Sequence, residues 1–215
     1  MSASAQKGIG IPILSVNSLS KSFNNKTVFK DLSFEVKQGM SLAITGKNGS
    51  GKSTLLKIIC GLLSPNTGQT QLLFSGKVYG SNEIYKFTGF SAPYLNLYDE
   101  LTGYENLELA AKLRGTGIKN IIKLINRFEL SESSKLLCKN YSSGMKQRLK
   151  LAFSLLCDPF ILLFDEPTTN IDESGILIFK KIIEEHRSKK IIIIATNDKS
   201  ETGLCENTLN VEEYK

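Results

Sequence analysis

A glycine-rich segment around residue 50 constrains this chain more than any other feature. It reads Gly-Lys-Asn-Gly-Ser-Gly-Lys-Ser-Thr over residues 46–54, between the apolar run 41–45 and the amphipathic run 55–63. A buried strand, a glycine loop and a helix in this order are typical of a phosphate-binding loop. The sequence therefore predicts an α/β core that holds phosphate groups; the alternative is an ordinary glycine-rich turn.

Each residue type in this loop suits phosphate binding. Gly46, Gly49 and Gly51 let the backbone wrap closely, so that its N–H groups point at phosphate oxygens. The helix that begins near Lys52 adds the positive end of its dipole. We expect the Lys52 ammonium to reach the outer phosphates and the Ser53 hydroxyl to ligate Mg²⁺. The other loop residues predicted to bind the nucleotide are Lys47, Asn48, Ser50 and Thr54.

A pair of carboxylates follows a later apolar run. Asp165 and Glu166 come directly after residues 160–164, which read as a buried parallel strand, as does the run 190–195. Ligands bind where the carboxyl ends of parallel strands meet, so both carboxylates should lie beside the phosphate loop. We expect Asp165 to hold Mg²⁺ through water, and Glu166 to polarise or deprotonate a water near the γ-phosphate.

Composition fits a globular domain without a metal cluster. Of the 215 residues, 41% are apolar and 22% are charged, which allows a substantial core. No apolar run approaches the roughly 20 residues that cross a bilayer, and the first residues do not resemble a secretory signal. The four cysteines are scattered and form no Cys-x-x-Cys pair. The net charge of +6 comes from scattered lysines, which favours a solvated surface over a nucleic-acid groove.

The order of the expected elements predicts one domain with an inserted part. We expect residues 1–11 to form a flexible extension and residues 12–215 to form a single domain. Amphipathic stretches begin after Thr102, the expected N-cap, and predict a helical subdomain at about residues 94–157. Short segments of alternating apolar and polar residues predict an antiparallel β layer; they are residues 13–37, 70–80 and 87–91.

These motifs resemble those of an ATP-binding cassette (ABC) nucleotide-binding domain, over nearly the whole chain from Leu14 to Val211. Residues 141–148 are similar to the family signature, usually written Leu-Ser-Gly-Gly-Gln; Ser142 and Gly144 match it, whereas Ser143 does not. The resemblance implies an α/β fold with a P-loop NTPase parallel-sheet core, an antiparallel β layer and a helical insertion. It also implies that Ser142, Ser143 and Gly144 of a second chain cap the ATP.

The resemblance assigns roles to further residues. Phe23 lies where the family places an aromatic side chain on adenine, and Val28 belongs to the same candidate site. The alternative for Phe23 is an ordinary core phenylalanine, since aromatic residues on strands mostly pack. Asp172 matches the family's dimer-contact aspartate. Because the chain has one phosphate loop and one signature, the resemblance implies pairing with a second copy or with a paralogous cassette.

Two positions depart from the family pattern. Pro93 stands where the family usually has a glutamine, and Asn197 stands where it has a switch histidine. Proline offers no side-chain amide to Mg²⁺ or water, whereas asparagine can bond a γ-phosphate but carries no titratable proton. Asn197 is therefore a candidate catalytic residue, and the two changes concern the rate of hydrolysis rather than ATP binding.

The resemblance is to short single-cassette bacterial subunits, including the haem-exporter type. It implies an ATPase with ATP and Mg²⁺ as cofactors that drives a separate transmembrane permease from the inner, cytoplasmic face of the cell membrane. Two alternatives stay open: a degenerate ATP-binding subunit with little hydrolysis, and a soluble ABC ATPase that acts on DNA or ribosomes. The chain has neither a coiled-coil insertion nor a second cassette, so we expect no nucleic-acid partner. We expect residues 94–101 to dock the permease; packing onto the core is the alternative.

Overall fold

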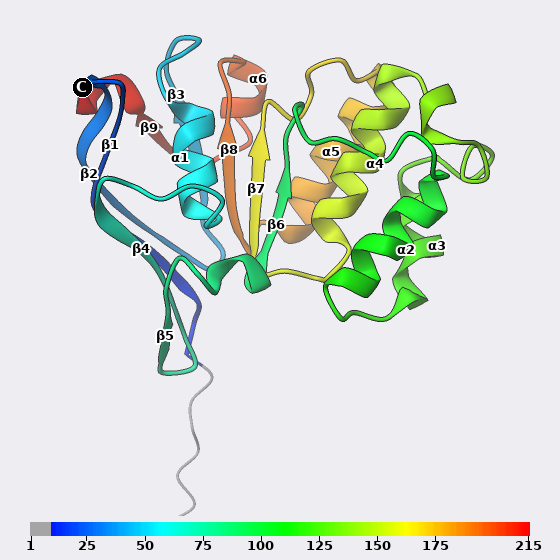
Figure 1. Cartoon of the computed structure of the whole chain (residues 1–215), viewed down its shortest axis with the longest axis horizontal. Coiled ribbons are helices and arrows are strands. Elements are labelled where there is room, and N and C mark those ends of the chain that lie inside the picture. The colour runs from blue at the N-terminus through cyan, green and yellow to red at the C-terminus, as the bar shows by residue number, and fades with distance from the viewer. Residues whose placement is uncertain (1–9) are drawn as a thin grey trace, which may run out of the picture.

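Two β-sheets and a group of helices make up the protein (Figure 1). The computed structural model describes residues 10–215, so residues 1–9 of the predicted extension lie outside the described residues. The larger sheet has the strand order β6-β7-β8-β3-β9, and its neighbouring strands are all parallel. Its strands are β3 (Ser41–Thr45), β6 (Thr88–Ser91), β7 (Ile161–Asp165), β8 (Ile191–Ala195) and β9 (Asn207–Asn210).

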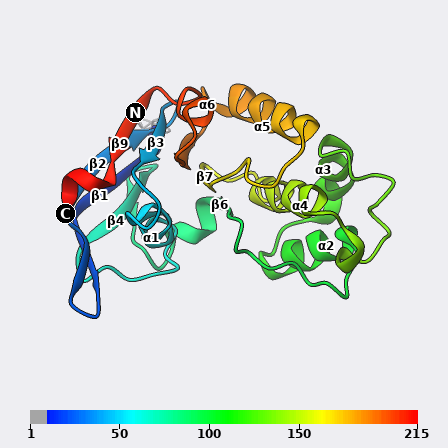
Figure 2. The same cartoon turned by 90° about the horizontal axis from the view of Figure 1, so that it is seen from above.

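The parallel sheet separates two hydrophobic cores. Every residue of β7 and β8 is buried, as the continuous apolar runs predicted. Because successive side chains on a strand point to opposite faces, Leu163 joins one core and Phe164 joins the other. Helix α1 (Lys52–Ile59) packs in the first core, with the antiparallel sheet. Helices α4 (Ser143–Leu155) and α5 (Glu173–His186) pack in the second core, on the other face (Figure 2).

The smaller sheet is the predicted antiparallel layer, with the strand order β2-β1-β4-β5. Asn24 and Asn25 connect its first two strands with φ angles of 46° and 64°, the left-handed backbone that suits a two-residue hairpin. The turn places the end of β1 beside the phosphate loop. The strands are β1 (Ile13–Phe23), β2 (Lys26–Lys37), β4 (Thr67–Phe74) and β5 (Lys77–Tyr79).

The prediction that residues 87–91 belong to this layer is wrong. They form β6, which pairs in parallel with β7 from Thr88 opposite Ile161 to Ser91 opposite Phe164. Packing against α4 decides the placement, since a Cβ atom on Gly89 would lie 1.8 Å from the carbonyl oxygen of Ser154. A run this short carries too little periodicity to distinguish the two sheets.

The helical subdomain contains α2 (Gly103–Leu113), α3 (Ile121–Arg127) and α4. Thr102 begins α2, as predicted: its hydroxyl accepts a hydrogen bond from the N–H of Glu105 at 3.2 Å, and the Glu105 carboxylate accepts one from the N–H of Thr102 at 2.8 Å. Such a capping box satisfies two otherwise unpaired donors. These helices lie within residues 94–157, and we keep those bounds, with a single domain over residues 12–215, as a proposal. Of the residues that the structure describes, none lie in a helix long and apolar enough to cross a bilayer.

The observed architecture has the predicted parallel core, antiparallel layer and helical insertion. A short helix, α6 (Lys199–Thr202), follows β8, and 3₁₀ turns complete the fold at residues 84–87, 118–120, 138–140 and 211–214. The last of these turns packs against β2 and brings the final residues close to the phosphate loop.

Candidate active site

The phosphate loop joins β3 to α1 and needs glycine at two positions. Gly46 and Gly51 have φ angles of 135° and 114°, a backbone region that residues with a Cβ atom rarely adopt. A Cβ atom on Gly51 would also lie 2.4 Å from the side chain of Val28, and one on Gly46 would lie 2.7 Å from the Ser50 hydroxyl. The loop is therefore closely packed between its strand and the antiparallel layer.

Lys52 folds back into the loop that it closes. Its ammonium donates hydrogen bonds to the carbonyls of Gly46 at 2.8 Å and Lys47 at 3.3 Å. Burial lowers the pKa of Lys52, and the nearby carboxylates, Glu166 foremost, oppose that shift. The ammonium thus lies inside the phosphate loop, where phosphate oxygens could accept the same protons.

One cavity of about 430 Å³ brings together most of the predicted nucleotide-binding residues of the hairpin and the phosphate loop, although Gly46 and Lys47 do not line it. The β1–β2 hairpin contributes Phe23 and Val28, and Phe23 is half exposed rather than a core residue. Lys26 and Lys215 also line the cavity, although no local sequence pattern points to either residue. The remaining lining residues are Thr27, residues 48–54 of the phosphate loop and Glu166.

Asp165 is a buried carboxylate with unused bonding capacity. It ends β7 and is 1% exposed, and among residues 10–215 neither of its oxygens has a hydrogen-bond partner of normal geometry. Burial raises the pKa of Asp165, whereas the facing hydroxyls of Ser53 and Tyr94 and the Lys52 ammonium lower it. The Ser53 hydroxyl lies in the phosphate loop and the Asp165 carboxylate lies beside it. Such oxygen donors are of the kind that a hard divalent cation such as Mg²⁺ prefers.

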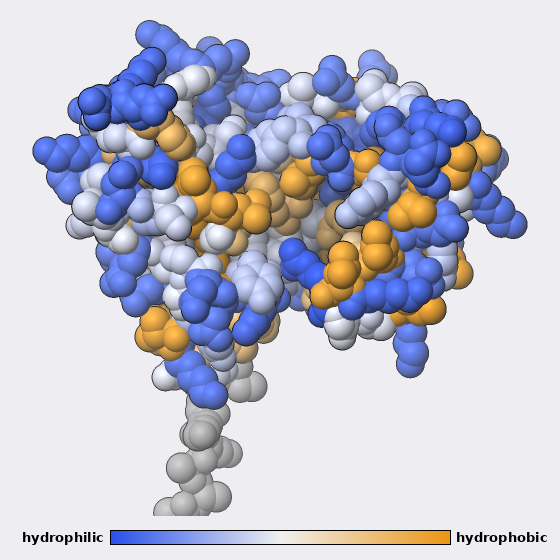
Figure 3. All heavy atoms as spheres, viewed as in Figure 1, coloured by the Kyte–Doolittle hydropathy of each residue, from blue (hydrophilic) through white to orange (hydrophobic). Residues whose placement is uncertain are grey.

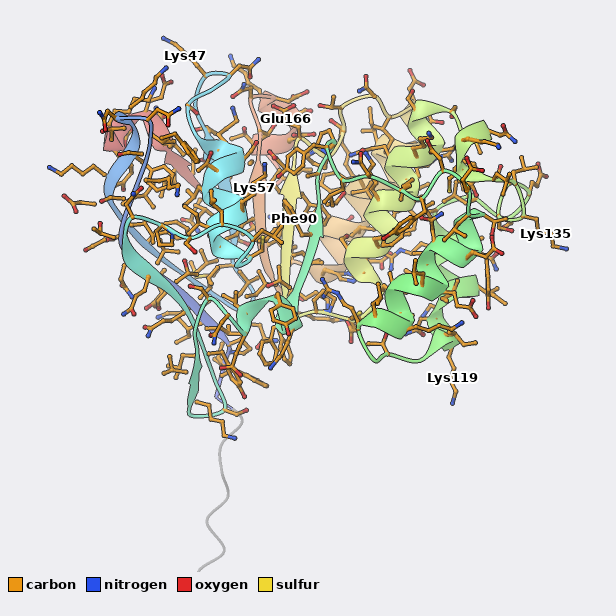
Figure 4. All side chains as sticks on the ribbon, viewed as in Figure 1. Lys47, Lys57, Phe90, Lys119, Lys135 and Glu166 are labelled. Atoms are coloured by element: carbon orange, nitrogen blue, oxygen red, sulfur yellow. The ribbon has the colours of Figure 1, made fainter. Side chains whose placement is uncertain are left out.

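Glu166 adopts a backbone conformation that is rare for its residue type. Its φ angle is 43°, and its N–H donates a hydrogen bond to the carbonyl of Ala195 at 2.9 Å. Strained residues of this kind persist where the surrounding structure holds them, commonly at functional sites. The conformation turns the chain sharply at the end of β7 and leaves Glu166 at the wall of the nucleotide cavity (Figure 4).

Asn197 contacts the phosphate loop directly. Its side-chain amide donates a hydrogen bond to the amide oxygen of Asn48 at 2.5 Å. The segment that carries it is anchored by Glu201, a buried residue of α6 whose carboxylate accepts hydrogen bonds from the N–H and the hydroxyl of Thr168. Sequence reasoning missed both Glu201 and the partner of Asn197, because these contacts join residues far apart in the chain.

The signature residues lie outside the nucleotide cavity of their own chain. Ser142 begins α4, and its hydroxyl accepts a hydrogen bond from the N–H of Met145 at 3.2 Å. Both Ser142 and Ser143 are exposed. Further along α4, the Arg148 guanidinium lies 3.4 Å from the Asp172 carboxylate, which ties the signature helix to the loop after β7. The signature residues therefore take no part in lining the nucleotide cavity of their own chain.

Comparison with known proteins identifies the family. Residues 29–169 match the family model described as ABC transporter. The lantibiotic transport ATP-binding protein SrtF of Streptococcus pyogenes is 32% identical over 185 residues, which cover 86% of this chain and 80% of that protein. The bacitracin transport ATP-binding protein BcrA of Enterococcus faecalis is 29% identical over 205 residues, 93% of this chain and 66% of that protein.

Solved structures agree with this assignment. The structure of an ATP-binding subunit of an ABC transporter superposes with a TM-score of 0.80 at 26% identity, over 92% of this chain and 85% of that one. The dimeric structure of the ATP-binding cassette MJ0796, in a post-hydrolysis state bound to ADP and Pi, superposes with a TM-score of 0.78 at 25% identity. The match covers 92% of this chain and 93% of that one.

These findings confirm the predicted fold class and the predicted role of an ATP-hydrolysing transporter subunit, and they do not favour a degenerate or a non-transport cassette. The chain therefore belongs to the ABC transporter family, and it forms the ATP-binding cassette of that family.

Proposed function

We propose that this chain binds Mg·ATP in the described cavity, hydrolyses it between two cassettes and drives a separate membrane permease from the inner face of the cell membrane. One observation carries the proposal. The phosphate loop, the buried Asp165 and Glu166 meet at one sheet edge, whereas the signature residues Ser142 to Gly144 lie outside that cavity. A complete site then needs a second cassette, either a copy of this chain or a paralogue.

Each residue of the site has a separate role in the proposed hydrolysis. Ser53 and Asp165 would hold the metal ion, which when bound neutralises charge on the phosphates. Lys52 stabilises the negative charge on the outer phosphates. Glu166 accepts a proton from the attacking water, and Asn197 holds the γ-phosphate or that water through its amide. The N–H groups of the phosphate loop and the N-terminus of α1 bind the remaining phosphate groups of the nucleotide.

Hydrolysis is expected to be slow in the wild type and about ten- to a hundredfold faster in Asn197→His. An imidazole donates a stronger hydrogen bond to developing negative charge than a neutral amide does, and a gain of about 1.4–3 kcal/mol in the transition state gives this factor. Steady-state phosphate release at saturating Mg·ATP measures it. An unchanged turnover with unchanged ATP affinity would mean that a residue other than the one at position 197 senses the γ-phosphate.

A groove between the core and the helical subdomain is the proposed permease-docking surface. Its volume is about 300 Å³, and Leu95, Asn96 and Leu97 of the predicted docking segment line it. Figure 3 shows apolar surface in the depression between the two halves of the molecule. Two cations, Arg114 and Lys150, line the groove, and none of its described lining residues is acidic. A permease segment with an apolar face and a carboxylate would complement this surface.

Leu97→Asp is expected to weaken binding of the permease at least tenfold and to leave ATP affinity within twofold of the wild type. A carboxylate at this position would be buried against apolar groups of the partner, and losing one central contact commonly costs about 2 kcal/mol. The effect is measured as the affinity of each variant, in detergent solution, for the membrane protein that copurifies with the wild type.

Leu177→Asp supplies the matched control, because Leu177 is an exposed leucine of α5 that is not among the groove's lining residues. If Leu97→Asp also lowers the melting temperature and the ATP affinity, then Leu97 packs the subdomain onto the core and does not dock the permease.

A further inference from the structure

The turn after the catalytic strand is tied to a distant helix. Thr168 follows Glu166 closely in the chain, and it donates two hydrogen bonds to the Glu201 carboxylate of α6, one from its N–H at 3.0 Å and one from its hydroxyl. Both bonds end on the same oxygen, Oε1. Because the two residues are 33 positions apart, this contact joins the loop after β7 to the segment after β8.

Glu201 is a buried acid in a short helix. It is 2% exposed, and α6 has only four residues. Acidic side chains are almost never fully buried unless they are paired, because removing a charge from water is costly. The bonds from Thr168 are charge-assisted, and such bonds are shorter and stronger than neutral ones. A carboxylate held in this way fixes the position of Thr168 more firmly than a solvent-exposed contact would.

The same segment carries Asn197, the candidate sensor of the γ-phosphate. Before it, the N–H of Thr196 donates a hydrogen bond to a carbonyl of β3 at 3.0 Å. After it, the N–H of Asp198 donates one to the Thr196 hydroxyl at 2.9 Å. Figure 1 shows α6 at the end of the sheet where β7 and β8 terminate. Asn197 thus leaves the sheet in a fixed turn, and Glu201 fastens the far end of that turn to Thr168.

The signature helix also holds the turn that carries Glu166. The Gln147 side chain of α4 is 3% exposed and donates a hydrogen bond to the carbonyl of Pro167 at 3.1 Å. Within the turn, the N–H of Thr169 donates a hydrogen bond to the carbonyl of Glu166 at 3.2 Å. Proline also restricts its own φ angle. The backbone after Glu166 therefore has one partner on α4 and one on α6, and the partner on α6 is Glu201.

We propose that Glu201 is a positioning residue for ATP hydrolysis: by holding Thr168, it fixes the catalytic Glu166 relative to Asn197, the two groups that act at the γ-phosphate. The inference rests on the hydrolytic function proposed above. Neither Glu201 nor Thr168 lines the nucleotide cavity, so loss of their contact should slow the chemical step without weakening ATP binding. Misplacing a catalytic group by about 1 Å can lower the rate by about a hundredfold.

Thr168→Val tests the role, because it removes the hydroxyl and keeps the shape of the side chain. We expect kcat to fall by about tenfold or more at saturating Mg·ATP, with KM and ATP affinity within about twofold of the wild type. Thr168→Ser keeps the hydroxyl and should restore kcat to within about threefold of the wild type. Thr208→Val is the matched control and should behave as the wild type, since Thr208 is an exposed threonine of β9 outside the nucleotide cavity.

A second variant identifies Glu201 as the partner of this hydroxyl. Glu201→Leu removes the acceptor and should lower kcat at least as far as Thr168→Val does. Adding Thr168→Val to Glu201→Leu should then lower kcat no further, because the contact is already lost. Two independent roles would instead give losses that multiply, and this result would overturn the pairing. All rates are compared at chain concentrations where the rate per chain has reached its plateau.

The alternatives give separate results. Wild-type kcat in Thr168→Val would overturn the positioning role. A fall in melting temperature and in ATP affinity that parallels the fall in kcat, and that Thr168→Ser does not reverse, would also overturn it, because the contact would then only stabilise the fold. If the wild type itself releases no phosphate at saturating Mg·ATP, the proposed hydrolysis fails, and the positioning role fails with it.

Discussion

Glu166→Gln is expected to slow ATP turnover by about 10²- to 10⁴-fold and to trap an ATP-bound dimer. Glutamine is nearly isosteric with glutamate but cannot accept the proton of the attacking water, and general-base catalysis contributes factors of this size. The positive φ angle of Glu166 stays as it is, because the substitution changes only the end of the side chain. Phosphate release measures the lost chemistry, and light scattering with and without ATP measures the dimer.

Glu184→Gln provides the control for this change, since Glu184 is an exposed residue of α5. It should turn over as the wild type does and should not accumulate a dimer. A Glu166→Gln protein that stays monomeric with ATP, or that hydrolyses ATP at the normal rate, would remove Glu166 from the catalytic role.

Lys52→Ala is expected to lower the affinity for Mg·ATP by about ten- to a hundredfold. A charge-assisted hydrogen bond to phosphate contributes about 1.5–3 kcal/mol, which corresponds to this factor. The substitution also removes the hydrogen bonds to the carbonyls of Gly46 and Lys47, so the loop itself loses two of its contacts. Titration with a fluorescent ATP analogue measures the affinity.

Lys119→Ala separates the loss of this contact from a general loss of positive charge. Lys119 is an exposed lysine at the far end of the helical subdomain (Figure 4), and its loss should leave ATP affinity within twofold. Equal affinities for Lys52→Ala and the wild type would show that Lys52 does not contact the phosphates.

The parts of the site that sequence predicts well are those encoded by neighbouring residues. The phosphate loop follows β3 and precedes α1, and Asp165 closes an apolar strand, so each motif brings its own structural context. Parallel strands then carry both motifs to the same edge, because their carboxyl ends point the same way. Phe23, whose predicted contact with adenine stays a prediction, is half exposed and lines the nucleotide cavity.

Contacts between distant segments could not be predicted in this way. Asn197 meets Asn48 across 149 positions, and Lys215 reaches the nucleotide cavity from the last turn of the chain. The ring of Tyr94, a residue of the predicted docking segment, lies against the ammonium of Lys57 on α1. Each of these contacts depends on how the two sheets and the helices pack, which no local pattern encodes.

Hydrolysis between two cassettes is tested most directly by the rate of phosphate release per chain, measured over a wide range of chain concentrations at saturating Mg·ATP. We propose that the exposed signature serines of a second molecule complete the site, so the rate per chain should rise with concentration, reach a plateau and vanish in EDTA. A rate per chain that stays constant down to concentrations at which the protein is monomeric, or that persists without a divalent cation, would contradict a metal-dependent site shared by two chains.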